Sequence, residues 1–307
     1  MMATPPGKVG ARRHNEAFAA WSMVSPALAG LLLFLLLPFA LAVVLSFSNH
    51  RFNSPLPTRW IGWENYARMF ADAGFQRALL NNVLFAAVIV PAQTALALGL
   101  ALLVNRPLRR MVFFRTMFFM PVIYPMALVS VVWALMLAPG QTGMMNQFLS
   151  AISFGAWNPA TDFLRHPAFA MPAIMLMSLW QGVGYQMVIL LAGLQAIPPE
   201  LYEAAAIDRA GRWQQFWHVT LPQLRNTLLF VVMVTTILAF RLFDQVWILT
   251  QGGPQDATTT VMFESFIAAR ERNQVGLGAA MSVVFFAIVC VVALAQHFLL
   301  RQERQMK

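Results

Sequence analysis

The chain has 307 residues, of which 59% are hydrophobic and 11% are charged, and its formal net charge is +9 at pH 7. Soluble domains carry roughly 25% charged residues, so this composition excludes an ordinary water-soluble protein. The positive charge therefore does not indicate nucleic-acid binding, and the single cysteine, Cys290, says nothing about the redox compartment.

Long segments without charge dominate the chain. No Asp, Glu, Lys or Arg occurs in 17–50, 78–105, 116–161, 166–199 and 273–300, and 226–255 is interrupted only by Arg241 and Asp244. A bilayer core of about 30 Å needs roughly 20 apolar residues of helix, whereas soluble helices are amphipathic. The sequence therefore predicts an all-α integral membrane protein with about six transmembrane helices, at 22–47, 79–104, 117–138, 168–194, 226–249 and 275–300.

The first apolar run follows three basic residues, Lys8, Arg12 and Arg13, as it does in a signal peptide. It is too long for the apolar region of a signal peptide and has no clear cleavage site with small residues. We therefore expect residues 1–21 to form a cytoplasmic segment that leads into an uncleaved first span.

The basic residues beside the predicted spans are unevenly divided between the two sides. Thirteen Lys and Arg residues lie in 1–16, 105–115, 199–225 and 301–307, and seven lie in 49–77, 138–166 and 250–274. Cationic loops are retained on the cytoplasmic side of a membrane. Both termini should therefore be cytoplasmic.

The outer connecting segments differ in character. Segment 49–77 contains Trp60, Trp63 and Tyr66, which favours a short helix at the membrane interface, where amphipathic aromatic side chains settle. Segment 139–165 is rich in Gly, Pro, Ser and Asn and is expected to face solvent. Because no linker or repeat divides the chain, residues 1–307 are expected to form a single transmembrane domain.

Span four contains polar and flexible residues at its centre, including Gln181, Gly182 and Tyr185. Such residues usually mark a transport path or a close helix contact, and both interpretations stay open. In span five, Arg241 and Asp244 are three residues apart and share one helix face. They are expected either to pair structurally or to line a substrate path, because an unpaired charge at bilayer depth is costly.

Segment 197–222 reads IPPELYEAAAIDRAGRWQQFWHVTLP and lies on the predicted cytoplasmic side. Its two prolines suit the start of a helix, and Glu200 and Glu203 favour the positive end of the helix dipole. Gly211 is expected to end this helix in the left-handed conformation. A second short helix would then lead to Pro222 at the beginning of the fifth span, so that a helix–turn–helix projects from the membrane.

Sequence motifs of catalysis are missing from the chain. A phosphate-binding P-loop needs a Lys, and the only two lysines, Lys8 and Lys307, lie outside such a context. The five histidines are scattered without metal-ligand spacing, and no GxSxG motif occurs. We therefore expect no enzyme, no cofactor and no metal site in this chain.

The cytoplasmic segment resembles the "EAA" loop, E-A-A-x3-G-x9-I-x-L-P, of permease subunits of ABC importers. The matching residues are Glu203, Ala204, Ala205, Leu221 and Pro222. Val219 replaces the isoleucine of the motif, and Arg209 stands where the family has glycine, so we expect the nearby Gly211 to make the turn instead.

Three further segments are similar to the carbohydrate-uptake branch of this family: FSNHRFNSPLPTRWIGWENYARMF, FFRTMFFMPVIYPMALVSVVW and DQVWILTQGGP. The resemblance implies the permease fold of type I ABC importers in a bacterial inner membrane. It also implies a second, homologous permease subunit, two copies of an ATPase that binds ATP and magnesium, and a periplasmic substrate-binding protein. Residues 197–222 would couple the permease to the ATPase.

The resemblance also implies a substrate path. The pattern W-x-G-x-x-Y of span four is similar to that of maltose-transporter membrane subunits, whose sugar contacts would fall on Gln181, Gly182 and Tyr185. In span five the corresponding positions are Thr235, Leu238, Ala239 and Leu242, and these are mostly apolar here. The substrate or its pose should therefore differ from that of maltose.

A sugar is the expected substrate, and two alternatives stay open. Uptake of a phosphorylated polyol such as glycerol 3-phosphate would give Arg241 an anion to bind. A membrane scaffold or receptor without transport would leave 197–222 as an ordinary connection between two spans.

Overall fold

The computed structural model describes residues 8–52, 54–55, 57–106 and 109–302. These residues form helices and connecting loops and contain no β-strand, apart from one isolated bridge between Ser48 and Trp60. The α-helices are α1 (Lys8–Leu31), α2 (Leu37–Ser46), α3 (Glu64–Ala71), α4 (Ala73–Val104), α5 (Arg109–Ile123), α6 (Met126–Met136), α7 (Met144–Ile152), α8 (Pro167–Gln195), α9 (Pro199–Ile207), α10 (Arg212–Gln215), α11 (Leu221–Phe240), α12 (Asp244–Leu249), α13 (Val261–Phe266) and α14 (Val275–Gln302). Three π-turns, η1 (Leu32–Leu36), η3 (Phe216–Thr220) and η4 (Ile267–Glu271), and one 3-10 turn, η2 (Gly140–Thr142), complete them.

Five helical stretches are long and apolar enough to cross a membrane. They are Ala20–Ser46, Ala73–Val104, Pro167–Gln195, Arg212–Leu249 and Val275–Phe298, and a bent pair, Arg110–Ile123 with Met126–Met136, makes a sixth. The prediction of an all-α membrane protein with about six spans is confirmed. Each segment that crosses a bilayer must itself be apolar along its whole length. The composition of each segment was therefore sufficient to locate these helices.

The third span is bent rather than continuous. We predicted one helix over 117–138, but α5 and α6 meet at 97° around Tyr124 and Pro125. Proline has no backbone N–H, and it disfavours the helical conformation of the residue that precedes it. The break at this point therefore has a local cause.

The fifth span is also interrupted, against the prediction of one helix over 226–249. The helix α11 ends at Phe240, and α12 begins at Asp244. Asn82 Nδ2 donates to the carbonyl oxygen of Phe240 (3.3 Å), and Thr260 Oγ1 donates to that of Leu242 (2.8 Å). These side chains satisfy carbonyl groups that a continuous helix would have satisfied internally.

Two π-turns precede prolines inside long helical stretches. The N–H of Leu37 bonds to the carbonyl of Leu32 ahead of Pro38, and the N–H of Leu221 bonds to that of Phe216 ahead of Pro222. Because proline cannot donate the next helical hydrogen bond, a locally widened turn accommodates it. Pro222 therefore lies within one continuous helical path from α10 to α11 instead of marking a separate beginning.

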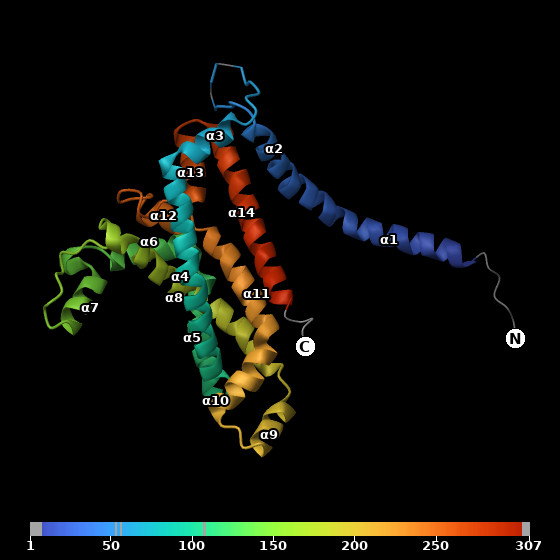
Figure 1. Cartoon of the computed structure of the whole chain (residues 1–307), viewed down its shortest axis with the longest axis vertical. Helices are drawn as coiled ribbons and strands as arrows, with labels where there is room; N and C mark the ends of the chain where they lie inside the picture. The colour runs from blue at the N-terminus through green and yellow to red at the C-terminus, as the bar shows by residue number, and fades with distance from the viewer. Residues whose placement is uncertain (1–7, 53, 56, 107–108, 303–307) are drawn as a thin grey trace.

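The helix α8 lies at the centre of the bundle, packed along α4, α5 and α11 (Figure 1). A Cβ at Gly184 would clash with the carbonyl oxygen of Phe118 in α5, so this glycine permits a close approach of the two helices. The helix α14 packs against α2, α11 and α13. These contacts build the part of the bundle around which the cavity described below forms.

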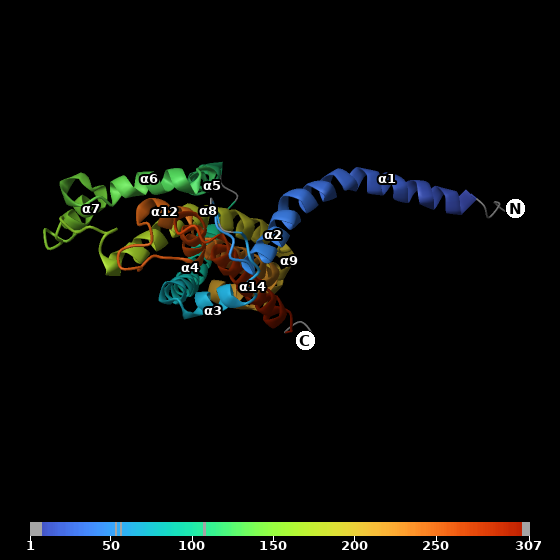
Figure 2. The same ribbon diagram turned by 90° about the horizontal axis from the view of Figure 1, so that it is seen from above.

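The helix α1 extends away from the rest of the chain, as Figures 1 and 2 both show. In the most apolar 18-residue part of Ala20–Ser46, no residue is buried against the rest of the chain. Such a span is stable only when lipid or another membrane subunit surrounds it.

The two connecting segments that we predict to lie on the outer side are more structured than the sequence indicated. The expected interfacial helix is α3, and Phe47 packs against Trp60, Trp63 and Tyr66 with ring centroids 5.0–5.4 Å apart. The segment 139–165, which we expected to be a solvent-facing loop, contains α7. Here the buried Asn146 donates to the carbonyls of Ala138 and Thr161 and accepts from Trp157 Nε1, which no local pattern could reveal.

Candidate functional site: a cavity between broken helices

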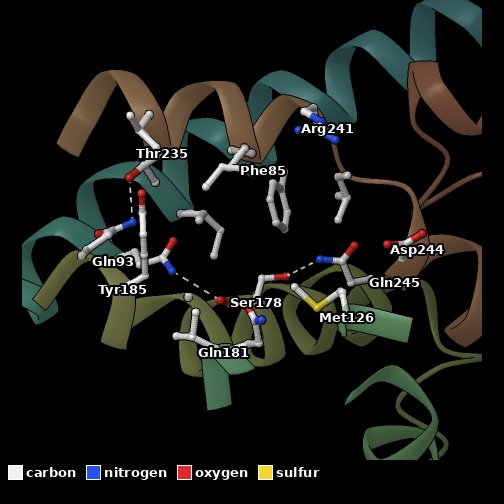
Figure 3. Close-up of a pocket in the computed structure, with 18 residues that line it drawn as sticks. Phe85, Gln93, Met126, Ser178, Gln181, Tyr185, Thr235, Arg241, Asp244 and Gln245 are labelled. Carbon is white, nitrogen blue, oxygen red and sulfur yellow. Dashed lines mark hydrogen bonds between the residues drawn. The ribbon is translucent and has the colours of Figure 1, made fainter. Parts of the chain in front are cut away.

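A cavity of about 490 Å³ opens between α4, α8 and α11, beside the breaks in spans three and five (Figure 3). Its lining residues are Phe85, Ile89, Gln93, Val122, Met126, Ser178, Gln181, Gly182, Tyr185, Gln186, Val234, Thr235, Leu238, Ala239, Arg241, Leu242, Asp244 and Gln245. This volume lies in the range of small-molecule binding sites.

The cavity brings together every residue that we predicted to lie on a substrate path. These residues are Gln181, Gly182, Tyr185, Thr235, Leu238, Ala239, Arg241, Leu242 and Asp244. They come from two spans about fifty residues apart in the sequence and share one surface only in the folded chain. Their contact with substrate remains a prediction.

The helix α8 presents one face to this cavity. Ser178, Gln181, Gly182 and Tyr185 recur at intervals of three or four residues, which places them on the same side of a helix. A Cβ at Gly182 would clash with the amide nitrogen of Gln93 on α4, so glycine at this position makes room for that amide. Gly182 thus has a structural role that its predicted role in substrate contact did not include.

The helix α11 contributes a mixed face. Thr235 Oγ1 accepts a hydrogen bond from Gln186 Nε2 (2.6 Å) and donates to the carbonyl oxygen of Val231 (2.7 Å). Leu238 and Ala239 add apolar surface one turn farther along. Apolar surface combined with a few oriented polar groups is typical of ligand pockets.

The expected geometry of Arg241 and Asp244 is wrong. The helix α11 ends before Arg241 and α12 begins at Asp244, so the two residues do not share a helix face, and they form no ion pair. Both side chains are exposed, and both line the cavity. The helix break turns a predicted intrahelical pair into two separate charges at the cavity wall (Figure 3).

Four polar lining residues were not among the predicted path residues: Gln93, Ser178, Gln186 and Gln245. Gln93 and Gln186 are amides inside charge-free apolar spans, and Gln245 follows the acidic residue of span five. An amide at bilayer depth is itself a signal of function or of a helix contact, and this signal was available in the sequence.

The helical hairpin of residues 197–222 projects from the end of the bundle opposite to α3 (Figure 1). Its first helix is α9, in which Glu203 and Ala204 are exposed and Ala205 is half-buried. The hydroxyls of Tyr202 and Thr220 lie 3.0 Å apart and join α9 to the following helical segment. The hairpin is thus held against the bundle while its Ala-rich face stays free in the described chain.

The turn of this hairpin differs from the prediction. Arg209 has a φ of 58°, whereas Gly211 has φ −69° and ψ 165° and caps the start of α10. The expected left-handed turn at Gly211 is therefore wrong. The left-handed residue lies at the glycine position of the motif, now occupied by Arg209, because the N–H of Ala210 must reach the carbonyl of Ala205 (2.9 Å) to close the helix end.

We therefore expect Arg209→Gly to stabilise the chain. A non-glycine residue in the left-handed region costs about 1 kcal/mol relative to glycine, so the midpoint of thermal unfolding in detergent should rise by a few degrees. Gly211→Ala is the matched control, because Gly211 has an ordinary φ and no neighbour that a Cβ would hit. Destabilisation by Arg209→Gly, or a large loss with Gly211→Ala, would contradict this assignment of the turn.

The chain matches the family described as "Binding-protein-dependent transport system inner membrane component" over residues 93–305. It is 36% identical over 267 residues to the probable ABC transporter permease protein YurN of Bacillus subtilis, covering 86% of this chain and 90% of that protein. It is 32% identical over 288 residues to the lactose transport system permease protein LacF of Rhizobium radiobacter, covering 92% and 94% respectively.

The fold is similar to that of a chain in the crystal structure of a bacterial ABC transporter involved in import of the acidic polysaccharide alginate. The TM-score is 0.81 at 21% sequence identity, with 95% of this chain and 98% of that chain covered. At this identity the likeness concerns the fold alone. With the family match over most of the chain and relatives above 30% identity, the chain belongs to the family of inner membrane components of binding-protein-dependent transport systems.

Proposed function

We propose that this chain is one permease subunit of an ABC importer in a bacterial inner membrane, and that the importer takes up a sugar. A second, similar permease completes the path, and a periplasmic binding protein delivers the substrate. The complex contains two copies of an ATPase, one of which docks on residues 197–222 of this chain. A similar alginate transporter has been solved in complex with a pentasaccharide-bound periplasmic protein, which supports such a partner here.

The cavity between α4, α8 and α11 is the observation that carries this proposal. It lies among membrane spans, and its polar lining consists mainly of amide and hydroxyl groups, which suit a polyhydroxyl ligand. Tyr185 adds an aromatic ring, which can stack against the face of a sugar. Relatives of this chain are named for uptake of lactose, trehalose and maltose, and diacetylchitobiose, in agreement with a sugar.

The alternative substrate, a phosphorylated polyol, draws its support from Arg241, which lines the cavity. Asp244 lines the same cavity, so the formal charges of the two side chains cancel. A dianionic phosphate would gain little from such a pair. The geometry therefore favours an uncharged substrate.

The ATPase partner is proposed to hold the nucleotide and the magnesium. Among the described residues no group of three or more His, Cys, Asp or Glu side chains is placed to bind a metal ion. The exposed face of α9, with Glu203 at its middle, offers the docking surface. A membrane scaffold without transport would have no need for a projecting helix that docks on an ATPase.

The function is tested by reconstituting the chain in proteoliposomes with its second permease, its ATPase and its binding protein. ATP-dependent accumulation of a radiolabelled neutral sugar supports the proposal. Accumulation of glycerol 3-phosphate but of no sugar would show that the substrate is a phosphorylated polyol instead of a sugar. Failure of the chain to co-purify with any ATPase would point to the scaffold instead.

The proposed orientation, with both termini in the cytoplasm, gives a further prediction. In a Cys290→Ser background, a cysteine at the exposed position Gln255 should react with an impermeant maleimide added to intact spheroplasts. A cysteine at the exposed position Gln214, in the cytoplasmic hairpin, should react only after permeabilisation. The reverse labelling pattern would invert the orientation and remove the basis for ATPase coupling.

A further inference from the structure

Three glutamines from three different helices meet at the cavity. Gln93 lies on α4, Gln186 on α8 and Gln245 on α12, and their side chains are only 6%, 3% and 8% exposed. A primary amide carries two donor hydrogens and an acceptor oxygen, and buried groups of this kind normally have their hydrogen bonds satisfied. The partners of these three amides therefore indicate which amide groups remain free to form a hydrogen bond with a ligand.

Two of these amides converge on Ser178. Gln93 Nε2 donates to the backbone carbonyl oxygen of Ser178 (3.4 Å), and Gln245 Nε2 donates to Ser178 Oγ (3.4 Å). The Ser178 hydroxyl donates its only hydrogen to the carbonyl oxygen of Ile174 (2.8 Å), so toward Gln245 it can only accept. Both partners are thus acceptors, and each amide must turn its nitrogen toward Ser178.

The third amide is oriented in the same way. Gln186 Nε2 donates to Thr235 Oγ1, whose hydrogen is already given to the carbonyl oxygen of Val231. The oxygen of Gln186 is buried and has no partner in the described chain. All three amides therefore have fixed orientations, and their hydrogen-bonding partners accept only.

No hydrogen bond from the described chain reaches the amide oxygens of Gln93 and Gln245. Figure 3 shows the two side chains approaching Ser178 from either side, with their oxygens turned away from it. An amide oxygen in a half-closed, low-dielectric site needs a donor. A hydroxyl group supplies one, whereas an ionised phosphate or carboxylate group offers these two oxygens no hydrogen and would be repelled by them.

We propose that Gln93 and Gln245, held by Ser178, bind hydroxyl groups of the substrate and select an uncharged polyhydroxyl ligand over an anion. The inference rests on the proposed function, because it assigns specificity within the same path. It adds residues that contact the substrate from α4 and α12 to the predicted contacts on α8. Each amide is expected to contribute a modest amount to apparent affinity and little to the rate of hydrolysis.

The test uses the full importer in proteoliposomes, with a panel of radiolabelled neutral sugars (lactose, trehalose and maltose) and with glycerol 3-phosphate. The variants Gln93→Leu and Gln245→Leu keep the side-chain size and remove the amide. Uptake of the transported sugar at low concentration should fall about fivefold for each, with a raised apparent KM and unchanged basal ATPase activity. Leu176→Met, an apolar change at an exposed residue of α8 outside the cavity, should have no effect.

Unchanged sugar uptake by both leucine variants would overturn the inference and leave the proposed function standing. Preference of the wild-type importer for glycerol 3-phosphate would overturn both the inference and the sugar assignment, and so would absence of uptake for every probe. If a leucine variant fails to assemble, Gln93→Asn and Gln245→Asn retain an amide but withdraw it by one methylene. Normal uptake by these assembled variants would also overturn the inference.

Discussion

Replacing Glu203 with Lys should abolish ATP-driven uptake while leaving the chain inserted in the membrane. Glu203 is exposed on α9 and forms no hydrogen bond or ion pair within the part of the chain that the structure describes. Its charge is therefore available to a partner, where a charge-assisted contact is stronger than a neutral one. Reversing that charge replaces attraction with repulsion at the proposed ATPase contact.

This expectation is measured as substrate uptake and ATP hydrolysis of the reconstituted importer, together with co-purification of the ATPase. Either the ATPase dissociates or hydrolysis continues without transport. Glu271→Lys is the matched control, because it makes the same change of charge at an exposed residue of η4, which follows α13 at the end of the bundle opposite to α9. Normal uptake by Glu203→Lys would show that residues 197–222 only connect two spans.

The double variant Gln181→Ala and Tyr185→Ala should lower uptake at least tenfold. The two side chains lie one turn apart on the cavity face of α8. Neither forms a hydrogen bond to another described residue, so their removal leaves no buried group of the chain without its partner. The variant should therefore lose only its contacts with the substrate, each of which is worth about 1 kcal/mol of binding free energy.

Complex assembly, basal ATPase activity and sugar affinity of the separate binding protein should stay unchanged in this double variant. The matched control is Leu176→Ala with Trp180→Ala, which removes two exposed side chains at the same spacing from a part of α8 outside the cavity. A control loss as large as that of the test pair would mean that truncating α8 damages the helix bundle in general. Wild-type uptake by Gln181→Ala with Tyr185→Ala would assign these two residues to packing.

The sequence by itself determined the positions of the membrane spans and of the helical hairpin in residues 197–222. The helices α4, α8 and α14 lie where charge-free apolar segments predicted them, because the bilayer selects each span by its own composition. The cavity residues that we predict to lie on a substrate path could also be named in advance, since the motifs around Gln181 and in the fifth span carry them. Their common position on one cavity followed only from the packing of α8 against α11.

Only the tertiary structure decided where the spans break and which amides face the cavity. Pro125 gave a local reason for the bend in the third span, but residues 241–243 contain neither proline nor glycine. That break is held by Asn82 and Thr260, which lie far away in the sequence and satisfy the carbonyls that the broken helix exposes. Gln93 and Gln245 likewise meet at Ser178 through contacts between three helices. Hydropathy acts within a segment, whereas these hydrogen bonds join segments, so no local pattern contains them.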